Sequence, residues 1–169
     1  MLETFSAYLR AGMTQLRETE STLGAELEMA RTYLALYQIR MEERLQFRIE
    51  AGGEALAARM PALMLQPLVE NAIHHGLEPK LDGGSVLVSA QVEEGRLRVR
   101  VADDGMGLET PSRRLRPGAG MAVANLRARL QTQFGPGATL TLEAAEPGTR
   151  AVLDLPYRAG AGAAARVTS

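Results

Sequence analysis

Two stretches of alternating residues, 85–92 and 96–103, constrain the fold more than any other feature of this chain. From Arg96 to Val101, arginines alternate with leucine or valine, so one face of this predicted strand is charged and the other apolar. Only Glu93-Glu94-Gly95 separates the two stretches, which is short enough for a hairpin. We therefore predict an antiparallel hairpin whose apolar face needs a layer of helices to cover it.

Residues 1–44 are predicted to be helical, with a break at Ser21-Thr22. Apolar residues recur at steps of three and four on both sides of this break: Leu2, Phe5, Leu9, Met13 and Leu16 before it, and Leu23, Leu27, Ala30, Leu34, Tyr37 and Met41 after it. The second stripe either packs on the rest of the domain or forms the seam between two helices. We favour the second interpretation, a helical linker or dimerisation arm, because the segment precedes every predicted strand.

The remaining pattern alternates strands with helices. We predict a strand at 45–50, a helix at 62–75, the hairpin, a helix at 120–134, and strands at 139–144 and 150–156. This order indicates an α+β fold, a two-layer α/β sandwich with a mixed, mostly antiparallel sheet, preceded by the helical arm. The predicted organisation is an arm at 1–44, a catalytic or binding domain at 45–157, and a low-complexity, disordered tail at 158–169.

Composition excludes several functions. The 169 residues include no cysteine, so disulfides, thiol nucleophiles and thiolate metal sites are absent. The single lysine, Lys80, follows a proline, so no GxxxxGK[ST] phosphate loop exists. A net charge of -1 gives no bulk attraction to nucleic acid.

The first polar cluster lies on the helix at 62–75, opposite its apolar face. The amide oxygen of Asn71 suits Mg²⁺ when nucleotide phosphates supply most of the ligand charge. Taken alone, Glu70 and His74 are more simply a solvated helical pair, four residues apart. The adjacent His74 and His75 point about 100° apart on a helix, which argues against a zinc site.

Two glycine-containing segments complete the candidate site. Asp103-Asp104-Gly105-Met106-Gly107 follows a strand, and a carboxylate there suits the amino group of adenine better than guanine, whose O6 is an acceptor. Gly118-Ala119-Gly120 opens a helix, where unpaired N–H groups favour phosphate. An ordinary Asp-Gly turn and a ligand-free glycine loop are the simpler interpretations of each segment alone.

The order of these motifs is much more specific than its parts. It resembles the GHKL ATP-binding (Bergerat) fold, and most closely the LytS-like sensor histidine kinases. The resemblance covers about residues 1–157 and is carried by PALMLQPLVENAIHHG (61–76), VADDGMG (101–107), GMAVANLRARL (120–130) and Gly148-Thr149.

The resemblance implies ATP and Mg²⁺ as ligands, and a role for each motif residue. It implies that Asn71 coordinates Mg²⁺ and that Asp103 binds the adenine amino group. Residues 108–119 would form a lid over the nucleotide. The other nucleotide-binding positions that it implies are His75, Gly105, Gly107, Gly118, Gly120, Met121, Asn125 and Thr149. His74, which with Glu70 is predicted to take part in catalysis, stands where many relatives carry a phosphate-binding lysine or arginine.

The implied reaction is phosphoryl transfer from ATP to a histidine. Related hydrolases carry a catalytic glutamate four residues before the magnesium-binding asparagine, and here that position is Pro67, which disfavours hydrolysis. Glu70 could orient the acceptor imidazole or a water. Both histidines belong to the nucleotide-site helix, so we expect the acceptor to lie outside this chain, in a motif resembling PHFLFN.

Two alternatives stay open. Ala122, Asp104 and His74 depart from the family pattern and are compatible with a degenerate nucleotide-binding pseudokinase or scaffold. An anti-sigma-factor-type serine kinase shares the same motifs. For the lead interpretation, the implied partners are the phosphoacceptor helix of the same kinase, in a homodimer, and a response regulator. The implied location is a cytoplasmic domain of a protein held in the bacterial inner membrane by segments that precede this chain.

Overall fold

A computed structural model of the chain describes residues 2–15, 19–109 and 120–160. Its elements, in order, are α1 (Leu2–Gln15), β1 (Glu20–Thr22), α2 (Leu23–Met41), the 3₁₀ turn η1 (Glu42–Arg44), β2 (Leu45–Ala51), α3 (Gly53–Leu56), β3 (Arg59–Pro61), α4 (Gln66–Asn71), the π-helical segment η2 (Ala72–Leu77), β4 (Gly84–Glu93), β5 (Arg96–Asp103), α6 (Met121–Phe134), the 3₁₀ turn η3 (Gly135–Gly137), β6 (Thr139–Ala144) and β7 (Thr149–Pro156).

The sheet has the mixed, mostly antiparallel form that the sequence predicts. Its five strands lie in the order β2-β4-β5-β7-β6. Strand β2 pairs in parallel with β4, and the other neighbours pair antiparallel. The β4–β5 hairpin is confirmed, with Glu93 opposite Arg96. A small second sheet, β1 with β3, was not predicted, because strands of three residues carry too short a pattern.

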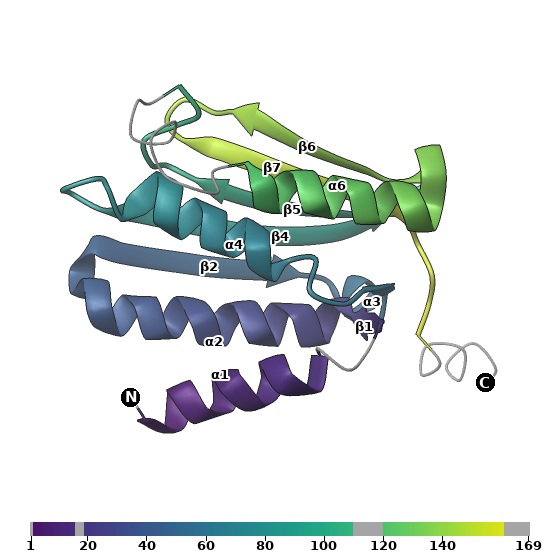
Figure 1. Ribbon diagram of the computed structural model, residues 1–169, viewed down its shortest axis with the longest axis horizontal. Helices are drawn as coiled ribbons and strands as arrows, with labels where there is room; N and C mark the ends of the chain where they lie inside the picture. Colours follow the sequence, from purple (N-terminus) through teal and green to yellow (C-terminus); the bar gives the residue numbers. More distant parts are fainter. Residues whose placement is uncertain (1, 16–18, 110–119, 161–169) are drawn as a thin grey trace.

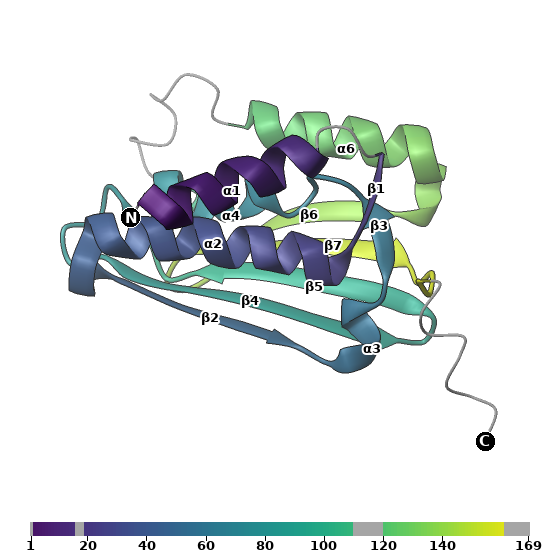
Figure 2. The same ribbon diagram turned by 90° about the horizontal axis from the view of Figure 1, so that it is seen from below.

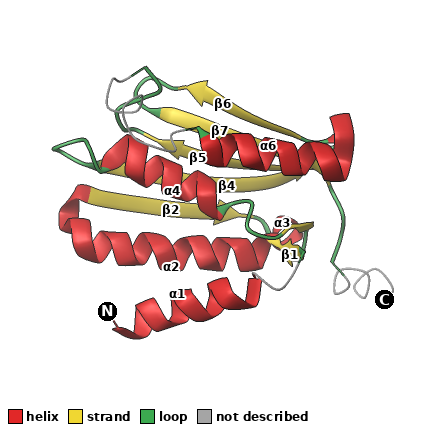
Figure 3. Ribbon diagram, in the orientation of Figure 1, coloured by secondary structure: helices red, strands yellow, loops and turns green. Residues whose placement is uncertain are grey.

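Helices α2, α4 and α6 cover one face of the sheet, and α1 packs on the outside of α2 (Figures 1 and 2). The leucine and valine residues of β5 point into this core, whereas its arginines face the open side. There the guanidinium groups of Arg96 and Arg98 donate to the carboxylate of Asp154 on β7, at 2.6 and 3.2 Å. The alternation of arginine with apolar residues in β5 therefore reflects a sheet that has one face covered by helices (Figure 3).

Helix α2 belongs to the core of the domain rather than to a separate arm. Leu23, Ala30 and Leu34 have no exposed surface and lie in the same hydrophobic cluster as the sheet residues. The first of the two interpretations, packing on the domain, thus applies to the second stripe. The first stripe behaves differently: Leu2 on α1 is 81% exposed and Phe5 is 49% exposed.

The C-terminal end of the described chain is paired with the strand region near β3. The N–H of Arg59 donates to the carbonyl of Arg158 at 2.8 Å, and the N–H of Gly160 donates to the carbonyl of Ala57, also at 2.8 Å. Residues 158–160, which were predicted to open a disordered tail, are therefore part of the folded unit, and 161–169 lie outside the described residues. Across the described residues, no helix combines the length and apolar character that crossing a membrane requires.

Candidate functional site

The start of α4 is fixed by a buried glutamate from α2. Glu26 is 2% exposed, and its carboxylate accepts hydrogen bonds from the backbone N–H groups of Leu63, Met64 and Leu65 at 2.9, 3.1 and 3.1 Å. These N–H groups precede the first turn of α4 and would otherwise lack partners. The carboxylate thus compensates their positive potential and sets where the helix begins.

Helix α4 continues as the π-helical segment η2, in which the N–H of Glu78 donates to the carbonyl of Ile73 at 2.8 Å. The wider turn brings Gly76 against the end of β5. A Cβ atom at Gly76 would lie 2.6 Å from Oδ1 of Asp103. The N–H of Met106 in turn donates to the carbonyl of Gly76 at 3.0 Å. The motif that contains Gly76 and the motif that contains Asp103 are therefore in direct contact. Only glycine, which has no Cβ atom, permits this approach.

Asp103 ends β5 in a buried position, with 6% of its surface exposed. Its Oδ1 atom accepts a hydrogen bond from the N–H of Gly105 at 2.9 Å. Thr149 stands directly opposite Asp103 in the β5–β7 ladder and is 1% exposed. The hydroxyl of Thr149 has no hydrogen-bond partner among the described residues. The buried carboxylate of Asp103 therefore lies beside the buried hydroxyl of Thr149, and this hydroxyl can still form a hydrogen bond.

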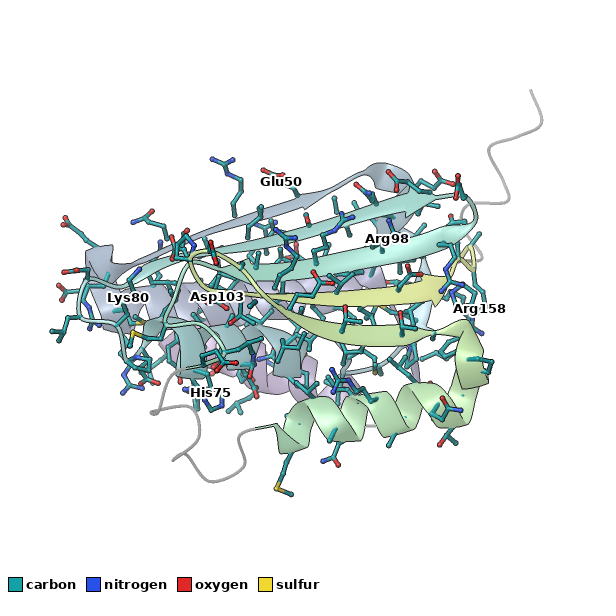
Figure 4. The ribbon with its side chains drawn as sticks, turned by 90° about the horizontal axis from the view of Figure 1, so that it is seen from above. Glu50, His75, Lys80, Arg98, Asp103 and Arg158 are labelled. Carbon is teal, nitrogen blue, oxygen red and sulfur yellow. The ribbon has the colours of Figure 1, made fainter. Side chains whose placement is uncertain are left out.

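The first and third motifs meet in a cavity of about 120 Å³. Helix α4 and η2 contribute Glu70, Asn71 and both histidines to its wall, and the start of α6 contributes Gly120, Ala122 and Val123. Gly120 has φ 86°, a left-handed conformation that favours glycine. In Figure 4, His75 and Asp103 lie at the same end of the sheet, which agrees with the contact between Asp103 and the adjacent Gly76.

His74 lines this cavity, but its ring nitrogens are engaged with other groups. Nε2 lies 3.1 Å from the hydroxyl of Tyr33 and 3.3 Å from that of Tyr37, both on α2. Nδ1 lies 2.8 Å from a carboxylate oxygen of Glu78. Burial and the neighbouring phenol of Tyr37 raise the pKa of Tyr33 well above its usual range, so Tyr33 stays a neutral hydroxyl. The imidazole is thereby held against α2.

Other residues that were predicted to bind the nucleotide do not line this cavity or lie outside the described residues. Met121 is 64% exposed, Asn125 is exposed on α6, and neither is among the residues that line the cavity. Gly107 has φ 80° and lies at the turn after β5. Gly118 and the predicted lid, apart from 108–109, lie outside the described residues.

The acidic neighbour of Asp103 has a structural partner. The carboxylate of Asp104 accepts hydrogen bonds from both the N–H and the hydroxyl of Ser85, each at 2.7 Å, at the start of β4. The side chain of Asp104 thus ties the turn to the adjacent strand.

Several residues around the site were missed by the sequence analysis. Glu26 gave one signal, since it is a glutamate within the apolar stripe of α2, between Leu23 and Leu27. Tyr33 and Tyr37 are spaced like core residues, so nothing in their pattern distinguishes a pair that holds an imidazole. Gln66, whose amide nitrogen donates to Glu70 at 3.1 Å, gave no signal.

The donors in the cavity suit a hard cation whose coordination is completed by a ligand. The amide of Asn71 and the carboxylate of Glu70 offer oxygen atoms, which Mg²⁺ prefers. No group of three or more His, Cys, Asp or Glu side chains in the described part of the chain could hold a metal ion by itself. Phosphate oxygens would have to supply the remaining positions.

Comparison with known proteins identifies the class to which this fold and site belong. Residues 57–159 match the family described as "Histidine kinase-, DNA gyrase B-, and HSP90-like ATPase". The chain belongs to this family and has the fold of its ATP-binding catalytic domain. Residues 1–45 match a second family, described as "Histidine kinase".

The most similar characterised proteins include sensor histidine kinases. The chain is 31% identical over 159 residues to the sensor histidine kinase YesM of Bacillus subtilis, which covers 94% of this chain and 27% of YesM. It is 33% identical over 160 residues to BtsS of Escherichia coli, covering 94% of this chain and 28% of BtsS. It is 31% identical over 166 residues to the sensor histidine kinase/phosphatase LytS of Staphylococcus aureus, covering 93% and 28%. The chain therefore spans little more than a quarter of the length of these relatives.

Solved structures show the same fold. The histidine kinase domain of the Erythrobacter litoralis EL346 blue-light activated kinase superposes with a TM-score of 0.59 at 19% identity, covering 90% of this chain and 74% of that one. The histidine kinase ThkA, in complex with the response regulator protein TrrA, superposes with a TM-score of 0.60 at 18% identity, covering 93% and 48%.

Proposed function

We propose that this chain binds Mg²⁺-ATP and transfers the γ-phosphoryl group to a histidine outside the chain, as the catalytic domain of a two-component sensor histidine kinase. One observation carries the proposal: Asn71 and Gly120 line a single cavity, while Gly76, in the segment that follows Asn71, packs on the buried Asp103. A triphosphate and its purine need such a pair of adjoining sites.

The adenine would bind at Asp103 and Thr149. A carboxylate can only accept hydrogen bonds, so it matches the amino group of adenine, and the unpartnered hydroxyl of Thr149 can satisfy a ring nitrogen beside it. Asn71 would hold Mg²⁺ through its amide oxygen, and the backbone N–H groups at Gly120 and the start of α6 would face the phosphates. When bound, Mg²⁺-ATP supplies the phosphoryl group and the charge neutralisation that its transfer requires.

The residues of this chain position the reactants. Glu70 faces the cavity with one carboxylate oxygen held by the amide of Gln66, so it can orient an incoming imidazole. His74 acts as a positioning residue, since the tyrosine pair and Glu78 hold its ring nitrogens. The family hydrolases carry a glutamate at the place of Pro67, so a water-activating base is missing there.

The full protein's partners follow from the same proposal. The acceptor histidine would lie on a helix preceding this chain, in a homodimer, and the phosphoryl group would pass to a response regulator. The ThkA structure contains such a regulator, TrrA. We expect the catalytic domain to lie in the cytoplasm, attached to the inner membrane through other segments of the full protein.

Isothermal titration with Mg²⁺ and a non-hydrolysable ATP analogue tests the proposal. We expect saturable binding that Asp103→Asn weakens by at least about tenfold, because a hydrogen bond to a charged acceptor contributes about 1.5–3 kcal/mol. Asp82→Asn, at an exposed aspartate, is the matched control and should bind like the parent. Absence of binding in the parent would contradict the proposal and favour a scaffold, whereas equal binding by the two variants would contradict the assignment of adenine to Asp103.

A further inference from the structure

A second cavity, of about 330 Å³, lies between α1, α2 and α4, apart from the predicted nucleotide contacts at Asp103. Its walls are mainly apolar side chains, from Leu9 and Met13 on α1, Met29 on α2, and Leu63. Gln66 and Tyr8 form its polar end. Small-molecule sites have this composition: an apolar cleft of about 300–1,000 Å³ with a few converging polar groups.

Gln66, one of the residues that line this cavity, carries an acceptor without a partner. The residue is 6% exposed, and its Nε2 atom donates to the hydroxyl of Tyr8 at 3.2 Å and to Oε1 of Glu70 at 3.1 Å. Since a carboxylate only accepts, the amide nitrogen must face Glu70, and this fixes the orientation of the amide. Its Oε1 atom is then buried with no hydrogen-bond partner among the described residues.

A buried amide oxygen without a partner is unfavourable, and the cavity beside it gives room for a donor. We propose that this cavity binds a small, largely apolar ring compound carrying one N–H or O–H donor, which bonds to Oε1 of Gln66. The carboxylate of Glu70 at the same end disfavours an anion, so the ligand is neutral or cationic.

The proposed site has structural consequences for both helices that border it. A ring between Leu9 and Met29 would fasten α1 to α2, and its donor would complete the hydrogen bonds of a residue that already holds Glu70. Because Glu70 also lines the nucleotide cavity, the two sites share a wall. The ring site does not require ATP, so it can be tested without nucleotide.

Indole and 1-methylindole are matched probes, because they differ at one position, where a methyl group replaces the hydrogen of the N–H donor. We titrate each into the ¹⁵N-labelled chain without nucleotide and follow amide shifts. We expect indole to move resonances near Leu9, Gln66 and Glu70 saturably, with a Kd on the order of 1 mM, as suits a ligand of this size. 1-Methylindole should bind about tenfold more weakly.

Two variants make the test decisive. Gln66→Met keeps the length of the side chain but removes the acceptor, so it should abolish the difference between the probes. Leu9→Trp, at a partly exposed position, should fill the cavity and weaken indole about tenfold without disturbing the core. Leu81→Trp, at a residue 89% exposed and outside the cavity, is its control.

The proposal is overturned if indole and 1-methylindole bind equally, if no resonance near the cavity saturates, or if Leu9→Trp leaves indole binding unchanged. It is also overturned if the same resonances shift with protein concentration alone, since a second copy of the chain would then occupy the cavity. All of these readouts are independent of ATP, and repeating them in Asp103→Asn separates this proposal from that of the nucleotide site.

Discussion

Replacing Glu26 by alanine should be among the most damaging single substitutions in this chain, although the residue lies on α2 and outside the cavity. Its carboxylate is the acceptor for three backbone N–H groups, and two of these hydrogen bonds, to Met64 and Leu65, are buried. A buried donor without a partner costs about 1–3 kcal/mol. Alanine also removes a buried charge, which offsets part of the loss.

The net expectation for Glu26→Ala is a loss of about 3 kcal/mol in the free energy of unfolding. For a chain of this length that corresponds to a fall in Tm of about 6–12 °C. Glu26→Gln should fall between the parent and alanine, because the amide keeps one acceptor oxygen but turns an NH₂ group toward backbone donors. Urea denaturation followed by circular dichroism measures both.

The control for this experiment is Glu28→Ala on the same helix. The carboxylate of Glu28 is 75% exposed and contacts Arg31 at 3.5 Å, a pair that contributes about 0.5 kcal/mol or less. If Glu26→Ala lowers the free energy of unfolding by no more than Glu28→Ala does, the hydrogen bonds to the Glu26 carboxylate do not stabilise the start of α4, and the prediction is wrong.

Three further predictions follow from the packing. Gly76→Ala should reduce binding of the ATP analogue at least about tenfold, because the new methyl would lie 2.6 Å from the carboxylate of Asp103, whereas Gly53→Ala, with nothing within 4 Å, should bind normally in the same titration. Tyr33 has a raised pKa in the folded state, so the stability it contributes is complete below about pH 10 and falls as pH rises further, when the unfolded chain loses the proton first. Urea denaturation between neutral and alkaline pH should therefore show a decline that Tyr33→Phe makes shallower, and an equal decline in both proteins would contradict it. Leu34→Ala, at a fully buried side chain, should cost about 2–5 kcal/mol by the same assay, and a cost below about 1 kcal/mol would return α2 to the status of an independent arm.

The regular part of the fold was readable from the sequence because its patterns are long and strongly periodic. From Arg96 to Val101 the residues of β5 alternate between arginine and leucine or valine, and the two strands after α6 begin and end within a residue of their predicted bounds. Periodicity does not tell what an apolar stripe packs against. The stripe on α2 was therefore assigned to a linker or dimerisation arm, whereas it covers the sheet.

The candidate site was predicted in its motifs but not in its geometry. The sequence placed Asn71, Asp103 and Gly120 on three separate elements, and tertiary contacts bring these elements together. The parallel pairing of β2 with β4 and the π-helical segment have no local signature. The roles of Gln66 and Tyr33 depend on neighbours more than thirty residues away in sequence, which no local pattern encodes.

The wide turn of η2 makes this stretch unusually sensitive to chain length. A π turn holds one more residue than an α turn. Here that extra residue determines which side of the Gly76 backbone faces Asp103. Losing a single residue between Asn71 and Gly76 would restore an ordinary helix and rotate the following side chains by about 100°. Proteins of this type should therefore tolerate insertions and deletions around β3 or after β7 far better than between these two residues, where the count of amino acids itself is part of the binding site.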